Sequence, residues 1–333
     1  MPTRIGQRLS AAVKDRTVSR TEAEEIVQAA KAERKWTPAL QGELSTFVMK
    51  HGSKMDAQTK AVLEDFISSS RPKVDLRDPL ALKEHRTDVT WTPVGPDASL
   101  YVDGITADDV MQGYIGDCYL AAGVASLAAA DPDIIRKAIK DNGDGTYTVR
   151  FFEGVGEGGR PKQVLITVDD DVARKPTGDA LYLSARDGKE QWPGILEKAY
   201  AKWKGGYERI GNGGYASDLF QSLSGRAADW GEVKDYKPDA LWKKIQATTS
   251  KDRPVAAGTF ADNDPRASYS GTGVHGDHFY TVLGATEEQG VKYVTLRNPW
   301  GMDEPTGNGA DDGVFKLPLT DFVKMYENIE FGG

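Results

Sequence analysis

The sequence holds one cysteine, Cys118, at the start of a segment that can favour its thiolate form. The residues from Tyr119 to Ala130 include no proline and are mostly Ala, Leu and Val, which predicts a buried helix beginning directly after the cysteine. The positive end of a helix dipole and its unpaired N–H groups favour thiolate, the nucleophilic form. Gln112, on a glycine-containing loop upstream, carries a side-chain amide that could donate a hydrogen bond near the thiol. The pattern predicts nucleophilic catalysis; the alternative is a small, buried apolar cysteine.

A thiolate enzyme also needs a base and a group that orients the base. His278 stands between a glycine-containing loop and a predicted strand, residues 279–283. After a turn at residues 284–290, a second predicted strand, residues 291–296, leads to Asn298. A hairpin would place His278 beside Asn298, whose side-chain oxygen can accept the imidazole N–H. The alternative for His278 is a structural histidine, but a Cys, His, Asn order favours a catalytic set.

Three blocks of the sequence resemble the catalytic blocks of the calpain family of papain-like cysteine proteases. They are Gln112-Gly-x-x-Gly-Asp-Cys118, Gly-Asp-His278-Phe-Tyr-Thr-Val and Leu-Arg-Asn298-Pro-Trp300-Gly. The resemblance covers roughly residues 75–331; one departure is Tyr119, where the family usually has Trp. It implies an α+β, papain-like protease core of two subdomains. One subdomain is helix-rich, and the other is rich in antiparallel β-structure.

The resemblance implies a cysteine endopeptidase that cleaves protein or peptide substrates. Cys118 would be the nucleophile, and its backbone N–H and Gln112 would hold the oxyanion. His278 would transfer the proton, Asn298 would orient it, and Trp300 would shield their hydrogen bond from water. Two alternatives stay open. One is a papain-like amidase, deubiquitinase or transglutaminase-type acyl transferase; the other is a binding module with a relict site, which the intact set of four residues disfavours.

The resemblance also implies calcium sites, and calcium-stimulated activity is therefore expected. An Asp and a Glu combined with carbonyl oxygens suit a hard cation, although surface carboxylates without metal are the alternative. A first site is expected at Val102, Gly104, Asp109 and Glu197. A second, less complete site would use Glu304, Asp311 and Asp312; Val314 stands where the family offers a carboxylate.

The chain is expected to divide into residues 1–70, 71–225 and 226–333. Residues 1–70 contain three of the 36 glycines and carry helix-start signals at Ser19, Thr37 and Asp56. They predict a small all-α bundle with a packing, docking or regulatory role, including binding of a regulatory partner. The turn at residues 68–72 marks its end. Residues 71–225 would form the first protease subdomain, with Cys118, and residues 226–333 the second.

Composition excludes several other classes of protein. The net charge is −8, with 28% charged and 39% hydrophobic residues, typical of a globular protein and not of one that binds nucleic acid. The sequence contains no run of eighteen apolar residues, so no membrane span is predicted. The basic first twenty residues contain no long apolar core, so no signal peptide is readable and a cytoplasmic location is expected. One cysteine excludes internal disulfides.

Overall fold

The computed structural model describes residues 4–13, 17–33, 37–69, 76–94, 98–156, 160–186, 188–267, 269–270, 272–302 and 312–333. By their contacts the residues form two compact units. The first comprises Met1–Asp75 with Asp141–Thr146, and the second comprises Leu76–Lys140 with Tyr147–Gly333.

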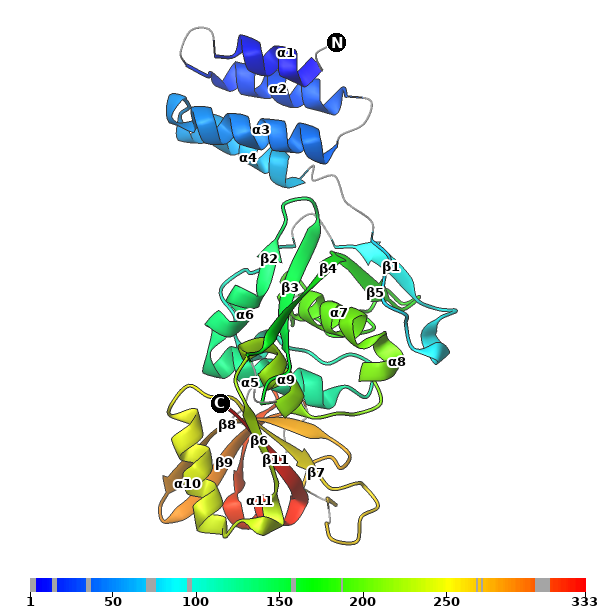
Figure 1. The fold of residues 1–333 in the computed structure, drawn as a ribbon, viewed down its shortest axis with the longest axis vertical. Coiled ribbons are helices and arrows are strands. Elements are labelled where there is room, and N and C mark those ends of the chain that lie inside the picture. The colour runs from blue at the N-terminus through cyan, green and yellow to red at the C-terminus, as the bar shows by residue number, and fades with distance from the viewer. Residues whose placement is uncertain are drawn as a thin grey trace. The chain divides into compact units, whose positions relative to one another are not determined.

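Four helices make up most of the first unit: α1 (Arg4–Ala11), α2 (Arg20–Lys31), α3 (Pro38–His51) and α4 (Ala57–Ser69) (Figure 1). The expected helix starts are confirmed. Ser19 and Glu22 form a capping box, the Thr37 side chain accepts the Leu40 N–H, and Asp56 accepts the Thr59 N–H at 2.7 Å. Sequence patterns did not identify α1, which is short and carries only two buried apolar residues.

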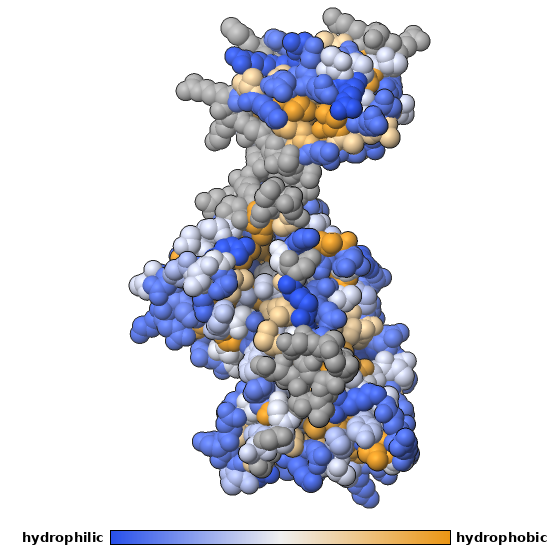
Figure 2. Space-filling model, turned by 180° about the vertical axis from the view of Figure 1, so that it is seen from behind, coloured by the Kyte–Doolittle hydropathy of each residue, from blue (hydrophilic) through white to orange (hydrophobic). Residues whose placement is uncertain are grey.

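A separate apolar core holds these helices together. It includes Ile5, Ile26, Leu44 and Leu63, one from each helix, and each is at most 1% exposed. Burying side chains of this kind stabilises a small bundle by about 1.5–3 kcal/mol each. The face drawn in Figure 2 is mainly polar over these helices, with a small apolar area. Met49, 81% exposed, is the most exposed large apolar side chain among the described residues.

The helical part of the chain, which we define as residues 76–225, belongs to the second unit except for Asp141–Thr146, and its described residues contain short strands and five α-helices. The strands are β1 (Thr90–Pro93), β2 (Ile139–Asp141), β3 (Thr146–Glu153), β4 (Lys162–Asp169) and β5 (Asp171–Arg174). The helices are α5 (Cys118–Ala130), α6 (Pro132–Ala138), α7 (Trp192–Lys204), α8 (Tyr207–Ile210) and α9 (Ala216–Ser224) (Figure 1). Strands β2, β3 and β4 form one sheet in that order, while β1 pairs with β5.

The sheet part, residues 226–333, is built on six strands in the order β10-β9-β8-β7-β11-β6, with every neighbouring pair antiparallel. The strands are β6 (Ala228–Glu232), β7 (Val255–Thr259), β8 (Phe279–Glu288), β9 (Val291–Arg297), β10 (Val314–Pro318) and β11 (Tyr326–Gly332). Helices α10 (Pro238–Thr249) and α11 (Leu319–Met325) pack against this sheet (Figure 1). The combination of helices with an antiparallel sheet confirms the expected α+β class.

Helix α5 joins the helical part to the sheet. Ten of its residues are buried, as its uninterrupted apolar composition predicts. Two side-chain hydroxyls fix it to the strands: Ser126 donates to the Val255 carbonyl at 2.8 Å, and Thr281 donates to the Ala122 carbonyl at 2.8 Å. Hydrogen bonds satisfy these polar groups in an apolar environment and determine how α5 lies on the sheet.

The described residues contain no single helix that is long and apolar enough to cross a membrane. Only α5 and α6 taken together, which are bent by 110° relative to each other, pass a test of length and composition.

Candidate active site

Cys118 is the first residue of α5, so its thiol lies at the N-terminus of a buried helix, as expected. The backbone N–H of Phe279, at the start of β8, hydrogen bonds to this thiol. Because Phe279 directly follows His278, the start of the helix lies beside the start of the strand that follows the histidine. The structure thus brings together residues that are 160 positions apart in the sequence.

The hairpin of β8 and β9 brings His278 to Asn298. Thr281 pairs with Arg297 in this antiparallel ladder, so the start of β8 lies at the end of β9. His278 Nε2 lies 2.9 Å from Asn298 Oδ1, and the two side chains are 5% and 0% exposed. The first strand is longer than expected: it continues to Glu288, with a bulge between Val282 and Gly284, so the glycine does not end it.

Trp300 covers the histidine–asparagine pair. Its ring centroid lies 4.5 Å from that of His278, and 4.6 Å from that of His275. The Trp300 backbone N–H also donates to Asn298 Oδ1 at 3.1 Å. The asparagine oxygen therefore accepts from two directions, which orients the amide, and the indole ring limits the access of water to one side of the imidazole.

Burial determines the protonation of this site. It raises the pKa of the Cys118 thiol to about 11, with a further increase from the Asp117 charge, although the Phe279 N–H lowers it. Burial also lowers the pKa of His278 to about 4, against the opposite effect of the Asn298 hydrogen bond. A neutral thiol and a neutral imidazole are therefore favoured at rest. The expected thiolate-favouring effect of the helix N-terminus is smaller than the cost of desolvating the charge.

The loop before Cys118 is held by close backbone contacts. The Gln112 N–H donates to the Pro299 carbonyl at 2.9 Å, which joins this loop to the segment that carries Asn298. The Gln112 side chain donates from Nε2 to the Ile115 carbonyl at 2.8 Å, and the amide has a second N–H. A Cβ on Gly113 would lie 2.6 Å from Tyr182 Cα, so only glycine fits there.

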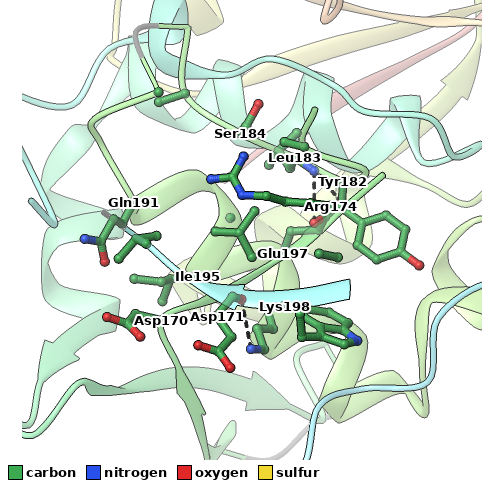
Figure 3. Close-up of a pocket in the computed structure, with 18 of the residues that line it drawn as sticks. Asp170, Asp171, Arg174, Tyr182, Leu183, Ser184, Gln191, Ile195, Glu197 and Lys198 are labelled. Atoms are coloured by element: carbon green, nitrogen blue, oxygen red, sulfur yellow. Dashed lines mark hydrogen bonds between the residues drawn. The ribbon is translucent and has the colours of Figure 1, made fainter. Parts of the chain in front are cut away.

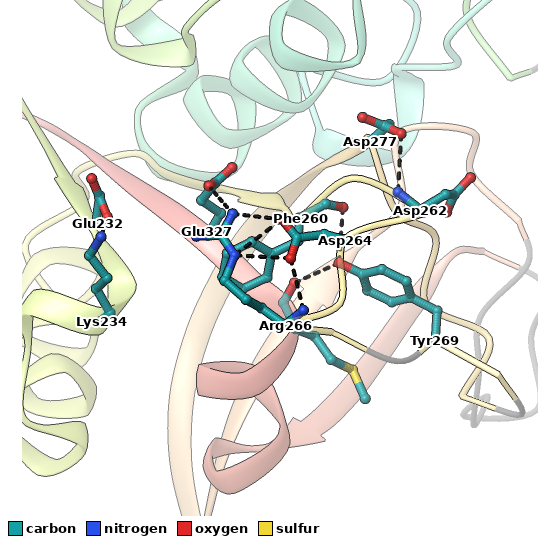
Figure 4. Close-up of polar contacts among 10 residues, drawn as sticks. Glu232, Lys234, Phe260, Asp262, Asp264, Arg266, Tyr269, Asp277 and Glu327 are labelled. Carbon is teal, nitrogen blue, oxygen red and sulfur yellow. Dashed lines mark hydrogen bonds and ion pairs between the residues drawn. The ribbon is translucent and has the colours of Figure 1, made fainter.

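The described residues between Phe260 and His278 are fastened to the sheet part by polar side chains, which Figure 4 shows together. Arg266 binds both Asp264 and Glu327 of β11, with its Nη2 2.6 Å and 3.0 Å from their carboxylates. The Tyr269 hydroxyl lies 2.9 Å from the carbonyl oxygens of Phe260 and Met325. These contacts hold the segment that precedes His278 in place.

An acidic cluster lies near the first expected metal site. Asp103, Asp109 and Glu190 each place a carboxylate oxygen within 4.8 Å of the others. Glu190 accepts the Val102 N–H at 2.6 Å, and its pKa is raised to about 7 by burial and by the charges of its acidic neighbours. Three hard oxygen donors that repel one another fit a divalent cation such as calcium. The expected residues Val102 and Gly104 lie in the same loop as Asp103.

Glu197, which was expected in the first metal site, is not part of the cluster of Asp103, Asp109 and Glu190. Glu197 is 1% exposed, and both its carboxylate oxygens accept the Leu183 N–H at 3.1 Å, as Figure 3 shows. It lies inside α7, where its neighbours Leu196 and Ala199 are fully buried, whereas Glu190 lies on the loop before that helix. The apolar residues around Glu197 were the signal for burial in the sequence; nothing comparable marked Glu190.

The second expected metal site is described only in part. Glu304 and Asp311 lie outside the described residues. Asp312 accepts the Val314 N–H with its carboxylate at 2.9 Å, a contact typical of a turn before a strand. Asp312 alone does not make a cation site.

A cavity of about 390 Å³ lies on the helical part, between the β4–β5 segment and the start of α7 (Figure 3). Its wall includes Asp171, Arg174, Glu197 and Lys198. Lys198 is buried and paired with Asp78 at 2.5 Å and with Asp169, so its charge is balanced within the fold. Sequence patterns pointed to none of these groups except Glu197.

The α+β fold, with a helical part and a sheet part that meet at a thiol, a histidine and an asparagine, is that of a papain-like cysteine protease core. A family model described as "Calpain family cysteine protease" matches residues 76–313, and the chain belongs to this family.

Several relatives are similar over the same region. The calpain-2 catalytic subunit of Mus musculus is 30% identical over 272 residues, covering 72% of this chain and 37% of that protein. Calpain-8 of Rattus norvegicus is 30% identical over 279 residues, covering 73% of this chain and 38% of that protein. The chain thus spans little more than a third of the length of these curated relatives. The solved procathepsin L 3 of Tenebrio molitor larval midgut aligns over 94% of this chain and 99% of its own, with 11% identity and a TM-score of 0.26, too low to establish a common fold.

Proposed function

We propose that this chain is a cysteine endopeptidase that cleaves protein substrates through a thioester intermediate. The observation that carries the proposal is the 2.9 Å contact between His278 Nε2 and Asn298 Oδ1, beside a thiol at the start of a helix. With Nε2 engaged by the asparagine, Nδ1 is the nitrogen that remains to exchange a proton with Cys118. Membership of a protease family supports the same reaction.

Each step follows from the chemistry of these groups. His278 Nδ1 takes the thiol proton as the sulfur attacks the peptide carbonyl carbon. The Cys118 backbone N–H and the Gln112 amide donate to the resulting oxyanion. The C–N bond breaks as the imidazolium protonates the leaving amine. Water then attacks the thioester, His278 accepts its proton and returns it to the sulfur, and the acid product and the thiol are released.

The raised pKa of Cys118 and the lowered pKa of His278 favour the uncharged pair at rest. An ion pair forms only when the two groups exchange a proton, because each charge is then offset by the other. A bound substrate excludes water and strengthens this attraction. Trp300 supports the exchange because its ring covers the imidazole and Asn298 receives the imidazole N–H.

The test is cleavage of unfolded casein by the purified chain, with and without the thiol-directed epoxide E-64. We expect cleavage without E-64, no cleavage with it, and a single adduct on Cys118 by mass spectrometry. Modification of Cys118 without any cleavage of casein or other proteins would contradict the endopeptidase. Transfer of the acyl group to an added amine in preference to water would indicate a transglutaminase-type enzyme instead.

We also propose that calcium stimulates this activity through the cluster of Asp103, Asp109 and Glu190. Their oxygens would hold the ion with the carbonyl groups of Val102 and Gly104; the ion would supply charge neutralisation and no chemistry of its own. Asp109 is further tied to the chain because it accepts from the Thr106 N–H at 2.7 Å. Asp109 precedes Gln112 by three residues, so a bound ion would stiffen the loop that carries the oxyanion donor.

Removing metal with EGTA is expected to lower activity, and adding calcium back to restore it, with a rise in melting temperature. Glu190→Gln should abolish both responses because it removes one charge from the cluster. The matched control is Glu288→Gln, an exposed glutamate that pairs with Lys316 at the surface, which should respond to calcium as the wild type does. Equal activity and melting in EGTA and in calcium would contradict the proposal.

The division into residues 1–70, 71–225 and 226–333 also stays a proposal. The separate core of α1 to α4 supports the first boundary, and the six-stranded sheet supports the last segment. A regulatory role of residues 1–70 is proposed through binding of a partner. A cytoplasmic location is likewise proposed, on the basis of the family.

A further inference from the structure

Asp117, the residue directly before Cys118, is fully buried and has an unusual environment. It is the N-cap residue of α5, yet its side chain accepts no N–H from the helix. Neither carboxylate oxygen has a hydrogen-bond partner of ordinary geometry among the described residues. Its side chain instead meets the carboxyl group of Glu197 and the amide of Gln112. A buried, ionised carboxylate without a hydrogen-bond donor would destabilise the folded state, because it loses its hydration.

Glu197 faces Asp117 from α7. It accepts the Leu183 N–H and a hydrogen bond from the Tyr207 hydroxyl, and it also hydrogen bonds to Asp117. The Tyr207 ring in turn stacks on Tyr182, with ring centroids 3.6 Å apart, so this side of the glutamate is rigid. The Asp117 carboxyl group is therefore held by a partner that is itself fixed in the core.

A hydrogen bond between two carboxyl groups requires a proton on one of them. Among the described residues, the groups that mainly shift the pKa of Asp117 and Glu197 include no lysine or arginine; the titratable neighbours that face the pair are Cys118, Tyr119, Tyr182 and Tyr207. Lys198, next to Glu197 in α7, is already paired with Asp78 and Asp169. Burial raises the pKa of Asp117 to about 7 and that of Glu197 well above its ordinary value, in agreement with a retained proton.

We propose that Asp117 and Glu197 share one proton, and that this carboxyl pair positions the Gln112–Cys118 loop and controls the charge beside the Cys118 thiol. Both are positioning residues, because neither reaches the substrate. The pair acts through two contacts: Asp117 is bonded to the backbone of the nucleophile, and its side chain meets the amide of Gln112. The catalytic consequence rests on the proposed function, but the effect on the thiol does not.

Two isosteric variants separate the positions of the negative charge. In Asp117→Asn the amide donates to the Glu197 carboxylate. The negative charge then stays on Glu197, which is not adjacent to Cys118 in the sequence. In Glu197→Gln the amide donates to Asp117, which fixes the charge directly beside Cys118. Because the Asp117 charge raises the pKa of the thiol, we expect Asp117→Asn to give the lowest thiol pKa and Glu197→Gln the highest.

The measurement is the pH dependence of Cys118 alkylation by iodoacetamide in the full chain, which requires no peptidase activity. The alkylation midpoints of the two variants should differ by about 0.5–1 pH unit, with the wild type between or at one of them. The matched control is Glu330→Gln. Glu330 is another fully buried carboxylate, which accepts the Ser217 N–H at 2.6 Å, and its replacement should leave the midpoint unchanged.

A second readout tests positioning. Asp117→Ala removes the pair and should lower kcat for a peptide substrate at least tenfold more than Asp117→Asn, with similar KM. Loss of kcat to the same extent in both variants would contradict a positioning role. Equal alkylation midpoints in Asp117→Asn and Glu197→Gln, or the reverse order, would overturn the shared proton.

Folding of the variants is itself informative. Each isosteric variant, and the double variant Asp117→Asn/Glu197→Gln, retains a donor and an acceptor between the two side chains. If the single variants do not fold, the double variant should still show a midpoint below that of the wild type, because it carries no charge at the pair. Failure of all three to fold would overturn the proposal. Absence of casein cleavage with the expected order of midpoints would contradict only the proposed function.

Discussion

We expect Cys118→Ala to lower the rate of casein cleavage by about 10⁴-fold or more, because removal of a catalytic nucleophile leaves only the contribution of the binding groups. The substitution removes one sulfur atom at the start of α5 together with its hydrogen bond from the Phe279 N–H, but it leaves the Ser126 and Thr281 hydrogen bonds that join this helix to the strands. The melting temperature should therefore stay within a few degrees of that of the wild type. Initial rates with casein and thermal melting followed by circular dichroism measure the two effects.

The matched control lies on the same helix. Ser126→Ala removes the hydroxyl that bonds to Val255, so it should lower the melting temperature while the remaining folded enzyme cleaves casein at a rate close to that of the wild type. Casein cleavage at the wild-type rate by Cys118→Ala would show that the peptidase activity belongs to another site or to a contaminant.

His278→Ala has the second largest expected effect, a loss of about 10²–10⁴-fold in kcat, because the variant lacks the group that exchanges protons with the sulfur and the leaving amine. The residual activity should rise with pH as free hydroxide replaces the base. Rates measured between neutral and alkaline pH check this expectation. The cavity left beside Trp300 also costs stability, so rates have to be compared at a temperature where both proteins are folded.

His275→Ala serves as the control for this prediction. His275 is on the same segment, and its ring also lies against Trp300, at 4.6 Å, but the described residues show no contact between it and Asn298. We expect less than a tenfold change in kcat. Equal losses in the two variants would mean that both histidines act by supporting Trp300, and would contradict the role of His278 as the base.

Local sequence patterns predicted a large part of this molecule. Side-chain caps at Ser19, Thr37 and Asp56 depend on residues at most three positions away, so they could be identified without knowledge of the fold. The hairpin of β8 and β9 was also predicted, since a turn joins two strands that follow each other directly. This local geometry was sufficient to place His278 beside Asn298, and the apolar run after Cys118 was sufficient to predict α5.

Tertiary structure decided which glutamate meets Asp109. The two candidates are separated by seven residues, and the beginning of α7 at Trp192 places one on a loop and the other in a buried turn. Helix phase determines the direction of a side chain only when the helix start and its buried face are known. The order of the strands in the six-stranded sheet also depends on contacts between distant segments.

The electrostatics of the site likewise required the fold. A helix N-terminus favours a thiolate at Cys118, and the apolar run after the cysteine was enough to predict that position. Burial, the charge at Asp117 and the neighbouring backbone of Phe279 together set the pKa, and burial dominates. Desolvation grows with every atom that the folded chain packs around the sulfur, from segments far apart in the sequence. For the same reason, only the folded chain brings Asp117 and Glu197 close enough to share a proton.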